Sequence, residues 1–136
     1  MTIDRRSLFL GTAAAAMLAA LPASAAAPFV DYKPGVIEDA LAAGKTVFVD
    51  YAAWWCTTCM AQKRVIARLV EQNPAYAKSM LFVRVDWDDF GDQSVARDRN
   101  IPRRSTLLVL RGDKELGRIV AGTSEADIKA LLDKGI

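Results

Sequence analysis

The pattern of apolar and polar positions along the chain predicts short strands that alternate with amphipathic helices. Residues 47–51 form a β-rich apolar run, which is typical of a strand buried on both faces. Further along, apolar residues recur at helical spacing between positions 65 and 70, with charged residues between them. This second pattern predicts a helix that ends near Gln72-Asn73, because Pro74 cannot continue it.

The remaining elements follow in the order expected of an α/β protein. Further strands are predicted at 29–32 (or an extended arm there) and 80–86, and further helices at 36–43 and 93–99. Residues 87–92 are expected to form a polar turn, with Asp92 as the N-cap of the next helix. This order predicts one α/β domain with a central mixed β-sheet and helices on both faces.

Cys56 and Cys59 stand where the strand at 47–51 ends and the next helix begins. The N–H groups of a first helical turn lack partners within the helix, and the aligned peptide dipoles add about half a positive charge there. Both effects stabilise a thiolate, so we expect the pKa of Cys56 to lie below the usual value of roughly 8.5. Cys59 lies one turn further along, where it can close a small disulfide ring with Cys56. The pattern therefore predicts a redox dithiol in which Cys56 attacks and Cys59 resolves.

A structural disulfide and half of a zinc site are the alternatives for this cysteine pair. A bridge that closes so small a loop stabilises a fold little by the chain-entropy argument. Zinc needs four ligands, usually Cys or His, whereas this chain has two Cys and no His. We therefore predict disulfide exchange, with no metal and no cofactor.

The stretch Val47 to Met60, VFVDYAAWWCTTCM, resembles the active-site segment of the thioredoxin family: an apolar strand, an Asp, an aromatic residue, Trp-Cys-x-x-Cys and a helix. Residues 106–120 resemble the closing β-hairpin of that family and residues 124–132 its last helix, so the resemblance covers roughly residues 35–134. It implies a thioredoxin-like fold and exchange with protein thiols and disulfides. The two threonines between the cysteines depart from the commoner Gly-Pro pair.

The resemblance also implies a role for Asp50. It lies six residues before Cys56, where thioredoxins carry a buried Asp that helps to move the proton of the resolving thiol. Burial would raise its pKa and suit it as a proton acceptor near Cys59. Arg84 matches the position of a lysine near that Asp. The alternatives are an exposed carboxylate at the strand end and a surface-facing arginine.

Trp54 and Trp55 precede the first cysteine. Two adjacent aromatic residues in an extended segment cannot both point inward, so at least one is expected to be exposed beside the cysteines. Trp55 matches the family tryptophan that flanks the first cysteine. We predict that both tryptophans contribute to the surface on which partners dock.

The clearest departure from the family lies just before the strand at 106–110, where thioredoxins place a cis-proline opposite the dithiol. Reading without a gap puts Ser105 at that position; alternatively, Pro102 is the cis-proline and three residues are inserted. A non-proline cis bond costs about 2.5–4 kcal/mol, so we expect a trans bond before Ser105 and a hydroxyl that faces the sulfurs. Arg104 and Ser105 are further predicted substrate-binding residues. The positive charge of Arg103 and Arg104 is expected to lower the pKa of Cys56.

The N-terminus has the organisation of a secretory signal peptide. Arg5-Arg6 precede an apolar run at 8–21, and the small residues 23–25 follow. The start resembles the bacterial twin-arginine export signal, so we predict a cleaved signal peptide at 1–25 and a thioredoxin-like domain at 26–136. An uncleaved membrane anchor is the alternative. Cleavage would take the formal charge from +2 to +1, and the absence of a long basic run argues against nucleic-acid binding.

These features predict a monomeric periplasmic thiol–disulfide oxidoreductase that acts on protein thiols and disulfides. It resembles the exported thioredoxin-like domains of disulfide-interchange and cytochrome-maturation systems, which implies a reductant supplied by a membrane-bound electron donor. The departure at Ser105 leaves open a non-enzymatic alternative, a redox-sensitive chaperone or a binding module for a metal or a partner. A peroxidase on the same fold fits the cysteine context less well.

Overall fold

The computed structural model describes residues 27–136, and the predicted signal peptide lies outside that range. The elements are β1 (Phe29–Asp31), α1 (Val36–Ala42), β2 (Thr46–Ala52), α2 (Thr57–Gln72), α3 (Ala75–Ser79), β3 (Met80–Asp86), α4 (Trp87–Phe90), α5 (Ser94–Arg97), β4 (Thr106–Arg111), β5 (Lys114–Val120) and α6 (Glu125–Asp133). Within this range no helix is both long enough and apolar enough to cross a bilayer.

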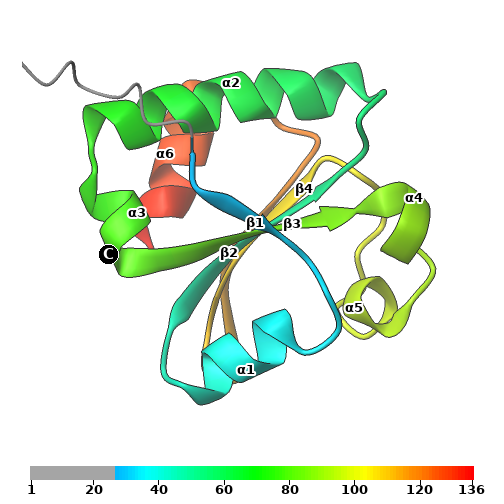
Figure 1. The fold of residues 1–136 in the computed structure, drawn as a ribbon. Helices are drawn as coiled ribbons and strands as arrows, with labels where there is room; N and C mark the ends of the chain where they lie inside the picture. Colours follow the sequence, from blue (N-terminus) through cyan, green and yellow to red (C-terminus); the bar gives the residue numbers. More distant parts are fainter. Residues whose placement is uncertain (1–26) are drawn as a thin grey trace, which may run out of the picture.

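The strands form one mixed five-stranded sheet in the order β1-β3-β2-β4-β5 (Figure 1). Strands β1, β3 and β2 are parallel, and β4 runs antiparallel to both β2 and β5. Central β2 pairs Tyr51 with Thr106 at the start of β4. This register brings the segment that follows β2 and the segment that precedes β4 to the same edge of the sheet.

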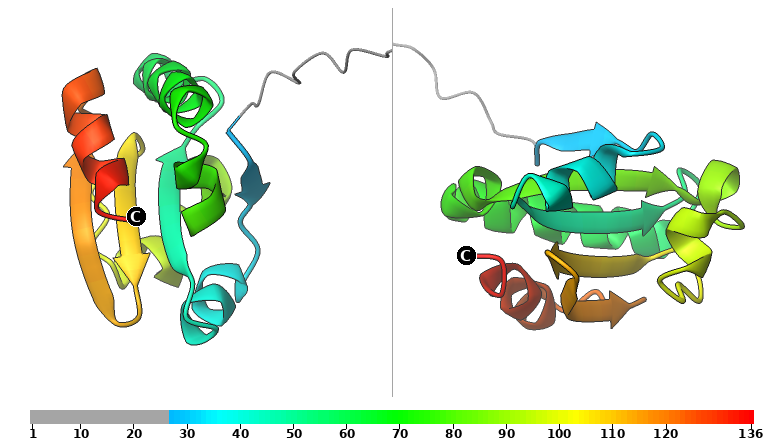
Figure 2. Two further views of the ribbon diagram at one scale, coloured as in Figure 1. Left: turned by 90° about the vertical axis from the view of Figure 1, so that its left-hand side faces the viewer. Right: turned by 90° about the horizontal axis from the view of Figure 1, so that it is seen from below.

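Helices cover both faces of the sheet, which confirms the predicted fold class (Figure 2). Because side chains alternate along a strand, β2 contributes Val47, Val49 and Tyr51 to one core and Phe48 to the other. The first core lies against α1 and α5, and the second lies against α2, α3 and α6. Asp50 follows the alternation of Phe48 and therefore faces the α2 side of the sheet.

Two local expectations need correction, and one short helix is not predicted by the sequence pattern. Residues 87–90 form the short helix α4 instead of a turn, because the carboxylate of Asp86 caps it by accepting the N–H groups of Asp88 and Asp89. The N-cap of α5 is Gln93 and not Asp92. The unpredicted helix is α3, which follows Pro74 and has that proline at its N-cap.

Candidate active site

Cys56 is the N-cap residue of α2, directly after the turn that leaves β2. Its Sγ accepts the backbone N–H of Cys59 at 3.2 Å, so the sulfur takes the place of the oxygen that usually caps a helix. Both thiols are free and nearly buried, with 3% of Cys56 and 4% of Cys59 exposed. The predicted junction of strand and helix therefore brings the two sulfurs together at a helix N-terminus.

Ser105 lies opposite the two cysteines, as the ungapped reading predicts. Its hydroxyl oxygen is 3.1 Å from the Sγ of Cys56 and 3.0 Å from the Sγ of Cys59. Its side chain is fully buried, and its φ of 64° lies in the left-handed region. Residues 27–136 contain no cis peptide bond, so the bond before Ser105 is trans, as expected. The same finding, together with the exposure of Pro102, contradicts the alternative in which Pro102 is the cis-proline.

The loop before β4 is fixed by hydrogen bonds to three elements. The N–H of Ser105 donates to the carbonyl of Tyr51 at 2.7 Å, and its carbonyl accepts the N–H of Ala121 at 2.8 Å. That carbonyl also accepts Nε2 of Gln62 at 3.0 Å, and Gln62 donates to Gly122 as well, at 2.9 Å. Gln62 is fully buried. Sequence reasoning missed it, although its place three residues after Cys59 on the apolar face of α2 was a usable signal.

The two cysteines have pKa values displaced in opposite directions. Burial by itself would raise the pKa of Cys56, but hydrogen bonds from Cys59, Ser105 and Arg104 outweigh it and lower this pKa to about 7. Burial and the hydrogen bond to Cys56 raise the pKa of Cys59. The predicted lowering at Cys56 therefore arises from donors on α2 and on the loop before β4. Near neutral pH Cys56 is therefore ionised in a large fraction of molecules, while Cys59 remains a thiol.

Asp50 is 1% exposed and forms an ion pair with Arg84 of β3, whose side chain is 25% exposed, at 3.1 Å. The alternative of an exposed carboxylate is therefore wrong. Burial raises the pKa of Asp50, and the charge and hydrogen bond of Arg84 offset this only in part. Arg84 uses one carboxylate oxygen, while the other, Oδ1, is buried without a hydrogen-bond partner among the described residues.

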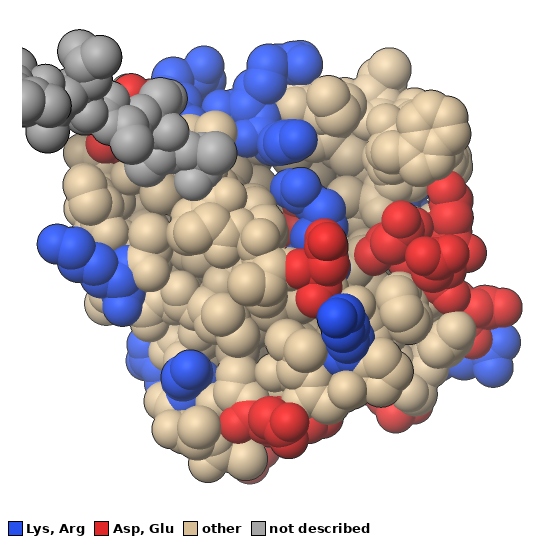
Figure 3. Space-filling model, in the orientation of Figure 1, with Lys and Arg blue, Asp and Glu red and all other residues tan. Residues whose placement is uncertain are grey.

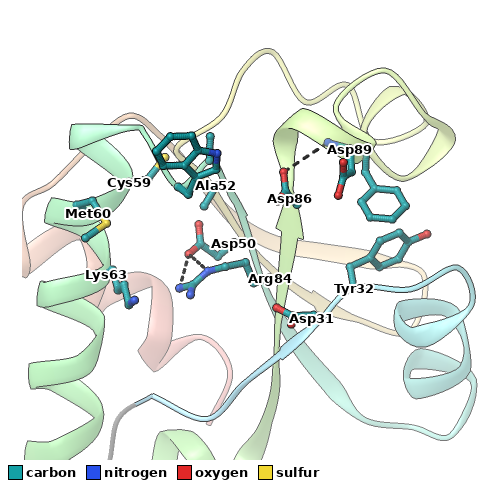
Figure 4. A pocket seen from close by; sticks show the side chains of 13 residues that line it. Asp31, Tyr32, Asp50, Ala52, Cys59, Met60, Lys63, Arg84, Asp86 and Asp89 are labelled. Atoms are coloured by element: carbon teal, nitrogen blue, oxygen red, sulfur yellow. Dashed lines mark hydrogen bonds and ion pairs between the residues drawn. The ribbon is translucent and has the colours of Figure 1, made fainter.

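Asp50 and Cys59 line the same pocket of about 440 Å³. Figure 4 shows the Asp50–Arg84 pair below Cys59, with Met60 and Lys63 of α2 on one side. At the other end Asp86 and Asp89 approach Tyr32. In Figure 3, acidic side chains gather where Figure 1 places α4, so this end of the pocket opens beside an acidic surface.

The two tryptophans have different surroundings. Trp54 is 81% exposed, whereas Trp55 is 46% exposed and donates its indole N–H to the carboxylate of Asp88 at 3.0 Å. The guanidinium of Arg104 lies over the Trp55 ring, 4.3 Å from its centroid. The expectation that at least one of the two tryptophans is exposed is thus confirmed, and their contribution to a docking surface stays a prediction. Asp88 was missed, since nothing in the sequence links α4 to Trp55.

The other predicted basic residue, Arg103, is oriented differently. Its Nε donates to the carbonyl of Arg104 at 3.1 Å. Arg104 is one of the main groups that lower the pKa of Cys56, and Arg103 is not one of these main groups. Of the two arginines, then, Arg104 has the larger effect on the pKa of Cys56. No cluster of three or more potential metal ligands occurs in the described part of the chain.

Comparison with known proteins gives a consistent result. A family model described as Thioredoxin matches residues 33–134. Thioredoxin-1 of Saccharomyces cerevisiae is 34% identical over 92 residues, which cover 68% of this chain and 82% of the yeast protein. Thioredoxin-2 of the same yeast is 32% identical over 100 residues, or 73% of this chain and 89% of its own. The crystal structure of Trxlp from Edwardsiella tarda superposes with a TM-score of 0.67 at 25% identity, covering 76% of this chain and 97% of Trxlp.

Proposed function

The chain belongs to the thioredoxin family and is a thiol–disulfide oxidoreductase, and we propose that it reduces disulfides of protein partners in the periplasm of a bacterium. The observation that carries the proposal is the unlike pair of thiols. Cys56 has a pKa of about 7, and the pKa of its neighbour Cys59 is raised. One thiolate beside one thiol is the starting state of a dithiol reductant.

In the first step the Cys56 thiolate attacks one sulfur of the partner disulfide. A bond forms between Cys56 and that sulfur, the partner S–S bond breaks, and the second partner sulfur leaves as a thiolate. The half-exposed ring of Trp55 and the exposed ring of Trp54 lie beside the entering segment and provide apolar contact for it. Arg104 contributes positive charge at the sulfur where negative charge resides before attack.

In the second step Cys59 loses its proton and attacks Cys56. The Cys56–Cys59 disulfide forms, the mixed disulfide breaks, and the partner leaves with two electrons more than it brought. Asp50 is the proposed proton acceptor, because its free Oδ1 lies in the pocket that Cys59 also lines. Its raised pKa gives it a greater proton affinity than an exposed carboxylate has.

The pKa of Cys56 supports the reducing direction. A strongly stabilised thiolate favours the reduced dithiol and makes a protein oxidising, as in members of this fold whose cysteine pKa is about 3.5. The value of about 7 for Cys56 instead matches the roughly 7 of thioredoxin. We therefore expect a potential near that of thioredoxin, about −270 mV.

Periplasmic location, a membrane-bound electron donor and a monomeric state complete the proposal. The signal-like residues 1–25 support export, and an exported reductant needs electrons from across the membrane. Fractionation of bacterial cells tests the location, with Arg5→Lys/Arg6→Lys as the matched control that keeps the charge. We expect the control variant to stay in the cytoplasm. Light scattering of the purified chain tests the monomer.

The experiment that tests the direction equilibrates the full chain with glutathione buffers and counts free thiols by alkylation. The Cys56→Ser/Cys59→Ser variant serves as the blank. A potential near −270 mV supports the reductant, whereas a value near −120 mV would identify a disulfide donor. A dithiol that does not cycle at all would leave the non-enzymatic binding module.

A further inference from the structure

The hydroxyl of Ser105 has two sulfurs as its neighbours and one proton to give. The backbone N–H and carbonyl of this residue are already engaged with Tyr51, Ala121 and Gln62. The hydroxyl oxygen lies within hydrogen-bond distance of both Cys56 and Cys59. A serine hydroxyl donates one hydrogen bond and accepts up to two, so it cannot donate to both sulfurs at once.

The protonation states of the dithiol determine the direction of these two hydrogen bonds. A thiolate at Cys56 can only accept, so it receives the proton of Ser105. A thiol at Cys59 can donate its own proton, to the Cys56 thiolate or to the oxygen of Ser105, so it does not need the proton of Ser105. This arrangement satisfies all three groups in the reduced site.

We propose that Ser105 is a catalytic hydrogen-bond switch, whose hydroxyl donates first to Cys56 and then, once Cys56 is in the mixed disulfide, to Cys59. The inference rests on the proposed function and adds to it a residue that acts on both steps. In the mixed disulfide Cys56 carries no negative charge and no longer requires the donor. The hydroxyl is then free to rotate toward Cys59 and to stabilise the thiolate that forms there.

Atoms and electrons balance along this sequence. Cys56 S⁻ and Cys59 S–H react with one partner disulfide to give the Cys56–Cys59 disulfide, one partner thiolate and one partner thiol. The proton lost by Cys59 passes through a base to the second partner sulfur, and the serine keeps its own proton throughout. Two electrons move from the dithiol to the partner.

The surroundings allow the hydroxyl to be removed cleanly. Ser105 occupies a φ of 64°, which Ala tolerates no better than Ser does and which Gly adopts freely. Ser105→Ala therefore removes the hydroxyl at constant backbone strain, and Ser105→Gly removes it while relieving that strain. The charged groups nearest the sulfurs stay in place in both variants: Arg104 at Cys56, and Asp50 and Lys63 at the pocket that Cys59 lines.

Thr106→Val is the matched control. The hydroxyl of Thr106, the buried first residue of β4, donates to the carbonyl of Arg103 at 2.7 Å and has neither sulfur as a partner. Valine keeps the shape of threonine and removes that hydroxyl. The control therefore separates the loss of any buried hydroxyl in this region from the loss of a hydroxyl that is hydrogen-bonded to the sulfurs.

The experiment mixes the reduced full chain with an aromatic disulfide reagent that releases one coloured thiolate at each step. The first release depends on reagent concentration and reports attack by Cys56, while the second is unimolecular and reports resolution by Cys59. We expect Ser105→Ala and Ser105→Gly to slow both releases about tenfold below the pKa of Cys56, as loss of a hydrogen bond to a charged group implies. The pKa of Cys56, read from thiolate absorbance, rises in both variants. Their potential falls by about 30 mV, which corresponds to a tenfold change.

Three results would overturn the switch: an unchanged rate for either step, recovery of both rates in Ser105→Gly, or equal slowing in Thr106→Val. These results differ from a failure of the proposed function. If the unmodified chain gives no second release, the oxidoreductase itself fails. If the unmodified chain and both Ser105 variants complete both steps at equal rates, only the switch fails.

Discussion

Two polar groups flank the same pair of sulfurs, and they differ in charge. The charged flank consists of Asp50 and Arg84, on strands β2 and β3, and adjoins the pocket that Cys59 lines. The neutral flank consists of Ser105 and Gln62, on the loop before β4 and on helix α2. Each flank contains a buried oxygen without a hydrogen-bond partner in the described chain, Oδ1 of Asp50 and Oε1 of Gln62.

The difference suggests a division of labour within one site. Burial of an ionisable group costs free energy, which is acceptable where the group has to take up a proton. A hydrogen-bond donor to a thiolate needs no charge of its own. Because the side chains of serine and glutamine do not titrate, they also add no pH dependence to the reaction. The charged flank is therefore suited to moving a proton, and the neutral flank to holding the sulfurs.

The largest effect is expected when a sulfur of the dithiol is removed. Cys56→Ser should lower the reduction rate of a protein disulfide at least about 10³-fold, because the attacking thiolate is lost. Cys59→Ser should keep the first step and accumulate a mixed disulfide with the partner. Mass spectrometry of the trapped adduct distinguishes the two. An adduct formed by the Cys56→Ser variant would reverse the assigned roles.

The next largest effect is expected from a substitution in the charged flank. Asp50→Asn should slow resolution by about 10²-fold while leaving the first step intact, since a positioned base contributes roughly 10²–10⁴-fold. Stopped-flow release of the second partner thiol measures it. Asp31→Asn is the control, because Asp31 lines the same pocket but is exposed. Equal slowing in the two variants would assign the effect to the general charge of the pocket.

The same Asp50→Asn variant should be more stable than the unmodified chain at neutral pH. Folding raises the pKa of Asp50, so the unmodified chain loses stability as pH rises through that folded value. Below the unfolded pKa of about 4, both side chains are neutral and the difference should vanish. Urea unfolding at several pH values tests this sign. A stability advantage for Asn that grows as pH falls would contradict it.

A smaller effect is expected from a substitution in the neutral flank. Gln62→Met keeps a similar volume but removes both hydrogen bonds of Nε2, to Ser105 and to Gly122. We expect a loss of about 1–2 kcal/mol in the free energy of unfolding. Gln93→Met is the control, since Gln93 donates to Asp89 from an exposed position, and a change within about 0.5 kcal/mol is expected there. A similar loss in both variants would mean that the burial of Gln62 does not increase the contribution of its hydrogen bonds to the free energy of unfolding.

The smallest effect concerns the cation beside the neutral flank. Arg104→Ala should raise the pKa of Cys56 and slow its alkylation about two- to fivefold at acidic pH, because Arg104 is half-buried and solvent screens its charge. Added salt should reduce the difference. Arg103→Ala is the control, and its rate should match that of the unmodified chain. A rate that falls equally in both variants would point to loop distortion.

Of the charged flank, Asp50 could be predicted from local sequence, whereas its pairing with Arg84, 34 residues away, followed only from the family resemblance. Asp50 interrupts an apolar strand, and its spacing from Cys56 matches a known pattern. The junction of strand and helix could likewise be predicted from a change of hydrophobic period. These features depend on neighbours within about ten residues along the chain, which is the range that periodicity and spacing describe.

The neutral flank could be predicted only in part. The ungapped reading placed Ser105 at the dithiol, but its positive φ is uncommon for serine and leaves no mark in the sequence. The bonds of Gln62 depend on contacts with Ser105 and Gly122, 43 and 60 residues away. Stacking of Arg104 on Trp55 depends on the pairing of β2 with β4. Such contacts arise from tertiary register, which local patterns do not contain.

The burial of both sulfurs also limits which disulfides can be attacked. Cys56 exposes only 3% of its surface and its Sγ lies 3.1 Å from the hydroxyl oxygen of Ser105, which leaves little room for a partner sulfur to approach. An extended or protruding segment can do so, whereas a disulfide inside a well-packed domain cannot. For the proposed reductase, we therefore expect selection by shape to spare the cross-links of folded proteins and to favour those of unfinished or misfolded chains.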